Sequence, residues 1–160
     1  MMLIHDDLLD SLSQEAKDHP RKRRNHNFHT SLADPINRML NALEPESYVC
    51  PHKHEGPDKR EVFIRLKGRL AVFYFDDAGA VTDQVVLGSD EGNYGVEIPA
   101  GTWHTIVALE SGTIVYEIKD GPYHPEDDKH FAPWAPREGS AEASVYLQKL
   151  LSLLGADGHV

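Results

Sequence analysis

The stretch EVFIRLKGRLAVFYF, residues 61–75, is dominated by β-branched and aromatic side chains and is interrupted once, at Gly68. Residues of the first two kinds favour β-strands, whereas glycine favours turns. The stretch therefore predicts two strands, residues 62–66 and 70–75, joined by a tight turn.

The same composition extends in both directions, from Tyr48 to Lys119, with Gly, Pro and Asp at the turns. Four further strands are predicted, at residues 81–87, 94–98, 102–109 and 113–119. No helical pattern separates them, and a parallel pair needs a connection of about a dozen residues or more. We therefore expect a mainly β fold in which antiparallel strands form a small β-barrel over about residues 48–119.

The N-terminal segment, residues 1–47, has helical patterns instead. A first helix is predicted before Pro20, because one face of residues 6–17 carries Leu8, Leu9, Leu12 and Ala16. A second is predicted after the capping residue Asp34, because Ile36, Met39, Leu40 and Leu43 follow at helical spacing.

The C-terminal segment, residues 120–160, begins with a stretch rich in Pro and aromatic residues, 121–139, and ends in a predicted helix between Ser140 and Gly155. The first part predicts an extended arm over the barrel or over a neighbouring subunit. The apolar terminal helices and this arm predict a homodimer, unless they only cover their own barrel. A length of 160 residues predicts one domain.

Composition restricts the partners and the compartment. With 16 Lys+Arg against 26 Asp+Glu, the net charge of -10 disfavours nucleic acid and anionic membranes as partners. The basic run at residues 21–24 is explained by a solvated loop or by anion binding. No apolar run approaches the roughly 20 residues of a membrane span, and we expect a cytoplasmic protein. Cys50 is the only cysteine, which excludes an internal disulfide and a thiolate-based zinc finger.

Three histidines and a glutamate occur within the predicted strands. His52 and His54 lie two residues apart, so in a strand they point the same way and can bind one ion together. Glu61 follows a turn at residues 55–58, and His104 follows the turn Pro99-Ala100-Gly101. Three nitrogens and one oxygen leave open positions on an octahedral ion, as in catalytic metal sites. The cofactor predicted is a divalent transition metal: Fe, Mn, Ni, Zn or Co.

The spacing of these residues resembles the two motifs of the cupin superfamily, whose members are small β-barrels. The residues that match are His52-x-His54, Glu61, Gly68 and Pro99-x-Gly101-x-x-His104. Outside the motifs, the segments at residues 24–29, 119–123 and 131–136 resemble the WbuC-family cupin-fold metalloproteins. The resemblance covers nearly the whole chain.

If Glu61 is not a ligand, the site either has three histidines alone or takes its fourth ligand from Glu117. Six residues separate His54 from Glu61, where the usual cupin motif has three or four. If residues 102–109 fold back on 113–119 through a four-residue loop, Glu117 faces His104 across the ladder and can take the place of Glu61. A loop one residue shorter turns Glu117 to the other face.

The resemblance implies a role connected with surface polysaccharides, and an open metal position can activate a carbonyl oxygen. The leading hypothesis is a metal-dependent isomerase or epimerase acting on a sugar or nucleotide-sugar intermediate. Its expected residues are His29 as acid or base and, for substrate binding, Arg24, Asn27, Glu117 and Tyr123. A loop that hydrogen-bonds to itself explains His26, Asn27 and His29 equally well. The alternatives are a non-haem iron dioxygenase and a sugar-binding module without catalysis.

Overall fold

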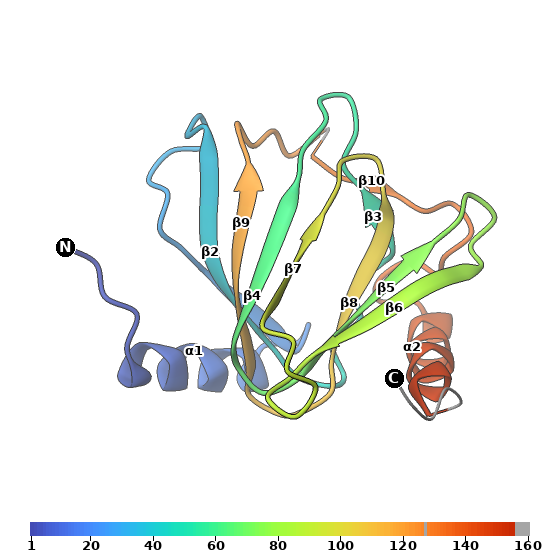
Figure 1. Cartoon of the computed structure of the whole chain (residues 1–160), viewed down its shortest axis with the longest axis horizontal. Helices are drawn as coiled ribbons and strands as arrows, with labels where there is room; N and C mark the ends of the chain where they lie inside the picture. Colours follow the sequence, from blue (N-terminus) through green and yellow to red (C-terminus); the bar gives the residue numbers. More distant parts are fainter. Residues whose placement is uncertain (127, 156–160) are drawn as a thin grey trace.

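Two five-stranded antiparallel sheets face each other in the computed structural model, which describes residues 1–126 and 128–155 (Figure 1). The first sheet has the order β1-β2-β9-β4-β7 and the second β10-β3-β8-β5-β6. The strands of the first are β1 (Arg23–Asn27), β2 (Ile36–Leu43), β9 (Thr113–Asp120), β4 (Glu61–Lys67) and β7 (Gly95–Ile98). Those of the second are β10 (His130–Phe131), β3 (His52–Lys53), β8 (Trp103–Ala108), β5 (Leu70–Phe75) and β6 (Val81–Leu87).

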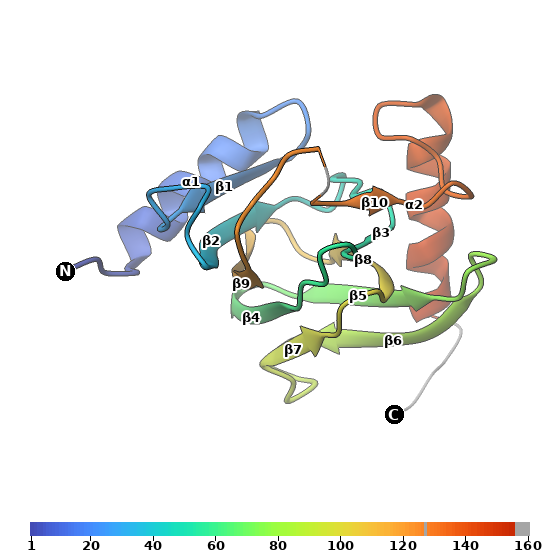
Figure 2. The same cartoon turned by 90° about the horizontal axis from the view of Figure 1, so that it is seen from above.

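A helix covers the outer face of each sheet, α1 (Asp6–Asp18) the first and α2 (Ala141–Leu154) the second (Figures 1 and 2). Successive side chains of a strand point to opposite faces of its sheet. In β9, Ile114 therefore packs against α1, whereas its neighbour Val115 packs between the sheets. Phe73 packs with α2, and Val72 lies between the sheets. The molecule is therefore a β-sandwich with a helix on each side.

The predicted mainly β, cupin-like fold with terminal helices is confirmed. The sheets do not close into a barrel within the part of the chain described, because β7 and β6 remain the last strands of their sheets. Gly68 has the predicted turn conformation, with a φ of +68°. None of the described helices is long and apolar enough to cross a membrane.

The helix predicted after Asp34 is wrong, because residues 36–43 form strand β2. The N-terminal segment is therefore only partly helical, and the sheet begins at Arg23. Leu40 and Ala42 are buried against α1, whereas Met39 and Asn41 face the space between the sheets. Apolar residues on both faces of a strand produce spacings that a helical pattern also fits.

The C-terminal arm crosses from the first sheet to the second. It begins at the end of β9 and pairs as β10 with β3, where Phe131 lies opposite His52. Farther along, Trp134 packs against Phe75 and Trp103, with ring centroids 5.1 and 6.1 Å apart. The arm thus lies over the chain's own second sheet.

Candidate metal centre and cavity

The four predicted metal ligands come together between the sheets. The ligand atoms of His52, His54, Glu61 and His104 all lie within 4.8 Å of one another, and all four residues are buried. His52 lies directly opposite His104 in the β3–β8 ladder, whereas Glu61 begins β4 in the facing sheet. Glu61 therefore lies with the histidines despite its unusual spacing in the sequence.

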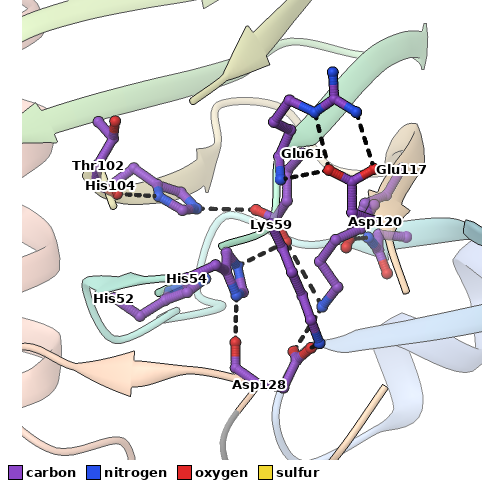
Figure 3. A network of polar contacts seen from close by, with 12 residues as sticks. His52, His54, Lys59, Glu61, Thr102, His104, Glu117, Asp120 and Asp128 are labelled. Carbon is purple, nitrogen blue, oxygen red and sulfur yellow. Dashed lines mark hydrogen bonds and ion pairs between the residues drawn. The ribbon is translucent and has the colours of Figure 1, made fainter. Parts of the chain in front are cut away.

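Each histidine is held by a backbone carbonyl through its Nδ1 atom. His52 Nδ1 lies 3.0 Å from the carbonyl oxygen of Cys50, and His104 Nδ1 lies 2.9 Å from that of Thr102. His54 Nδ1 makes the same contact with the carbonyl oxygen of Asp128 (Figure 3). A carbonyl oxygen only accepts, so each Nδ1 donates its proton there, and the Nε2 atom of each ring is left free to face the other ligands.

Two of these Nε2 atoms face the carboxylate of Glu61. His104 Nε2 lies 3.0 Å from Oε2, and His54 Nε2 lies 2.9 Å from Oε1 without the geometry of a hydrogen bond. Although burial opposes it, contact with His104 and His54 lowers the pKa of Glu61 well below its usual value. Burial lowers the pKa of His52 well below 6.5.

The donor set fits a divalent metal. Neutral imidazole lone pairs and a carboxylate oxygen repel one another unless a proton or a cation lies between them. Buried Nε2 atoms that are oriented by Nδ1–H bonds to carbonyls are the usual arrangement of metal-binding histidines. His52, His54, Glu61 and His104 are therefore able to hold a divalent transition metal.

A cavity of about 500 Å³ opens beside these ligands. Three of the four, His52, Glu61 and His104, line it, and its apolar floor includes Phe63 and Ile106. Much of the wall is polar, and includes the asparagines Asn25, Asn27, Asn37 and Asn41. The volume suits a small organic ligand.

The register of the first sheet places the polar wall in rows across the strands. Asn37 of β2 pairs with Lys119 of β9, which pairs in turn with Glu61 of β4. In the next row of the same face, Glu117 pairs with Met39 and Phe63. Glu117 is thus a diagonal neighbour of the candidate ligand Glu61, about 7–8 Å away at the backbone.

A buried network of charges supports this wall. Lys59 Nζ and Lys119 Nζ donate to the two carboxylate oxygens of Asp128, at 2.9 and 2.6 Å. Lys119 Nζ also lies 3.8 Å from Glu61 Oε1. Although burial opposes it, the nearby carboxylates raise the pKa of Lys119. Asp128 therefore joins the C-terminal arm to the candidate metal centre, through this network and through His54 (Figure 3).

Glu117 faces the cavity but does not pair with His104. The predicted hairpin is wrong, because β8 and β9 lie in different sheets. Asn41 Nδ2 donates to the Glu117 carboxylate in a short hydrogen bond. Burial, and then the negative charge of Glu61, raise the pKa of Glu117.

The cavity is also lined by the other predicted site residues, Arg24, Asn27, His29 and Tyr123, whose side chains make different contacts. His29 follows β1, and its Nδ1 lies 3.1 Å from both the backbone nitrogen and the carbonyl oxygen of Arg38. The ring of Tyr123 lies below Lys119 Nζ, 5.4 Å from its centroid. Arg24 is turned toward α1, where its Nε lies 3.4 Å from Glu15.

Sequence reasoning considered Arg23 only as part of the basic run at residues 21–24, and it missed Asn37 and Asn41 on the cavity wall. A signal for Arg23 was present, because alternation in a strand over residues 23–27 puts Arg23, Asn25 and Asn27 on one face. Cys50 also borders the cavity and is buried, and burial raises the pKa of its thiol. It packs as a small apolar residue beside Tyr48.

Residues 4–87 match the model of a family described as "Domain of unknown function (DUF6016)". The chain belongs to this family. The match includes β1 to β6 and three of the four candidate ligands, while His104 lies beyond it. No curated protein matches the chain.

The fold of this chain is similar to those of several proteins of known structure, among them a cupin superfamily protein, an isomerase and a capsular polysaccharide assembling protein. A cupin superfamily protein from Desulfitobacterium hafniense is 14% identical, with a TM-score of 0.50 over 68% of this chain and 86% of that one. The L-ribose isomerase of Cellulomonas parahominis is 16% identical, with a TM-score of 0.53 over 78% and 71%. The capsular polysaccharide assembling protein CapF of Staphylococcus aureus is 20% identical, with a TM-score of 0.55 over 67% of this chain and only 28% of CapF. These likenesses establish the cupin fold.

Proposed function

We propose that this protein is a metal-dependent isomerase or epimerase that acts on a sugar. The observation that carries the proposal is the position of Glu117, a buried carboxyl group in the cavity wall diagonal to Glu61. A sugar carbonyl at the candidate metal centre would lie beside a group able to move a proton. The hydrogen-bonding cavity wall suits a ligand with several hydroxyl groups.

A divalent metal at this site would act as a Lewis acid on the carbonyl oxygen of the substrate. His52, His54, Glu61 and His104 would hold it, and all four residues are buried. Phe63 and Ile106 give the cavity an apolar floor against which the carbon chain can lie.

Glu117 carries the proton in this proposal. Its carboxylate removes the proton from the carbon next to the carbonyl, and the electron pair of the broken C–H bond moves toward the carbonyl oxygen. Return of the proton to the former carbonyl carbon, together with transfer of the adjacent hydroxyl proton to the former carbonyl oxygen, gives the isomer. Return of the proton to the opposite face of the first carbon gives the epimer. Neither outcome needs an oxidant or a reductant. Asn41 positions Glu117 through the hydrogen bond from Nδ2.

His29 remains a candidate for moving protons between substrate oxygens, and Asn27 and Tyr123 for binding hydroxyl groups. All three residues line the cavity. Arg24 is less suited to the anion clamp that we predicted, because its guanidinium pairs with Glu15. Arg23 shares the cavity face with Asn25 and Asn27, but its guanidinium is held by Glu138 at 2.7 Å and is no better suited to an anion.

We further propose that the sugar is an intermediate of surface-polysaccharide biosynthesis and that the protein is a homodimer. The resemblance to WbuC-family proteins supports the first statement, and so does the similar fold of CapF, a capsular polysaccharide assembling protein. The fold of an L-ribose isomerase shows that this architecture can support sugar isomerisation. Light scattering over a range of concentrations tests the dimer, and a constant monomer mass contradicts it.

The test is exchange of substrate carbon-bound hydrogen with solvent. Metal-loaded protein is incubated with a panel of aldoses and ketoses in D₂O, and NMR follows deuterium at the carbon next to the carbonyl. We expect exchange with at least one sugar, its loss in Glu117→Gln, and normal exchange in Glu142→Gln, an exposed control on α2. Metal-loaded wild-type protein that exchanges no sugar contradicts the proposal. Oxygen uptake by the iron-loaded protein would instead favour a dioxygenase, and sugar binding without exchange would favour a binding module.

A further inference from the structure

Asn37 is a buried amide with no partner on the polar wall of the cavity. The residue is 1% exposed, and neither Nδ2 nor Oδ1 has a hydrogen bond within residues 1–126 and 128–155. A buried amide without a partner is costly, so such groups occur mainly where a ligand or an ordered water completes them. Because an amide both donates and accepts, a hydroxyl group satisfies it well.

The position of Asn37 relates it to the candidate metal centre. It stands in the same row as Lys119 and Glu61, two strands from Glu61, which corresponds to about 10 Å across the sheet. A carbon chain of a few hydroxylated atoms spans this distance when one end lies at the histidines. Asn37 is therefore placed to contact a distant hydroxyl group of a ligand whose carbonyl end lies at the metal.

The charges of the wall disfavour a phosphorylated ligand. Arg21 and Arg23 are both held by Glu138, each at 2.7 Å. Lys119 is held by Asp128. A phosphate group would have to displace these carboxylates, while Glu61 and Glu117 add negative charge to the same cavity. Among the described lysines and arginines of the wall, the exposed Lys129 alone has no ion-pair partner.

We propose that Asn37 forms a subsite for a hydroxyl group of an uncharged polyhydroxy ligand, which excludes sugar phosphates and nucleotide sugars as preferred substrates. This inference rests on the proposed function and narrows its substrate class. Asn37 selects the ligand by binding a hydroxyl group and takes no part in proton transfer.

The test uses two unreactive probes that differ only by a phosphate group, ribitol and ribitol 5-phosphate, titrated calorimetrically into the zinc-loaded protein. We expect ribitol to bind at least about tenfold more tightly than its phosphate, and Asn37→Leu to weaken ribitol about tenfold, as expected for one lost hydrogen bond. Gln148→Leu, which removes an exposed amide from α2, should bind ribitol like the wild type. Tighter binding of ribitol 5-phosphate, or unchanged ribitol binding by Asn37→Leu, overturns the proposal.

A melting experiment separates ligand binding from a structural role. Since neither amide atom has a partner, Asn37→Leu should melt at or above the temperature of the wild type while it loses ribitol binding. A lower melting temperature together with lost binding would show that Asn37 is structural and overturn the subsite. Ribitol binding that depends on Asn37, without hydrogen exchange in any sugar, supports the subsite and contradicts the isomerase. Hydrogen exchange in a sugar, together with normal ribitol binding by Asn37→Leu, supports the isomerase and contradicts the subsite.

Discussion

His52 and His104 are direct partners across the β3–β8 ladder, and their ring centroids lie 4.5 Å apart. His54 and Glu61 complete the group, and the Nδ1 atoms of all three histidines are engaged by backbone carbonyls. The geometry of the ligands is thus built into the sandwich before any ion binds, which limits the reorganisation that binding requires.

The first prediction concerns metal content. Protein purified without a histidine tag should hold close to one divalent metal ion per chain, whereas His52→Ala and His104→Ala should each lower the affinity for metal at least about tenfold. His5→Ala, which removes an exposed histidine at the start of α1, is the matched control. Elemental analysis measures the content. Wild-type protein that is free of metal and cannot be reloaded would contradict the candidate centre.

The second prediction concerns the pH dependence of the metal-free protein. Burial lowers the pKa of His52 well below 6.5, so the unfolded chain takes up a proton at a higher pH than the folded one. The stability from the neutral ring is therefore present above about pH 6.5 and is lost as the pH falls toward the folded-state pKa. Melting temperatures between pH 7 and 5, measured with EDTA, should fall less in His52→Asn than in wild type or His5→Ala. Equal falls in all three would show that His52 does not contribute.

Local sequence patterns predicted the strands but not every element around them. The β-branched and aromatic residues at 70–75 and 81–87 gave strands with the same limits in the structure. Residues 36–43 were mistaken for a helix because Leu40 packs outward on α1 while Leu43 packs inward between the sheets. In the sequence, apolar residues on the two faces of a strand have the same spacing as apolar residues on one face of a helix. Only the folded structure, in which α1 covers the outer face of β2, shows that these residues form a strand.

The candidate ligands were predictable for a different reason. His52 and His54 share a strand face whatever the topology, and motif spacing linked them to His104. The partner of Glu117 was not predictable, because the local folding of β8 onto β9 is the simplest expectation and the jelly-roll connection places them in opposite sheets. Asn37 and Asn41 were missed with β2.

A third prediction concerns Asp128, whose carboxylate pairs with two buried lysines. Asp128→Ala leaves the ammonium groups of Lys59 and Lys119 buried without this partner and should lower the free energy of unfolding by roughly 3–5 kcal/mol. Asp120→Ala removes an exposed pair with Arg60 and should cost about 1 kcal/mol or less. Urea denaturation compares the two variants. Equal losses would mean that the buried network adds nothing beyond a surface ion pair.

The last prediction compares two glycines with almost the same backbone conformation, Gly68 at φ +68° and Gly92 at φ +70°. A Cβ at Gly92 would meet nothing within 4 Å, so Gly92→Ala should cost only the strain of the left-handed conformation, about 1–2 kcal/mol. A Cβ at Gly68 would stand 2.8 Å from the Cα of Thr113, whose hydroxyl also hydrogen-bonds with the backbone of Arg69.

Gly68→Ala should therefore lower the free energy of unfolding by roughly 1–3 kcal/mol more than Gly92→Ala, because the backbone of β9 has to move. The turn at Gly68 passes the chain from β4 in the first sheet to β5 in the second, so the shift acts where the two sheets are joined. Urea denaturation of both variants gives the difference. If Gly68→Ala is no less stable than Gly92→Ala, the close approach to Thr113 does not explain why glycine occupies this turn.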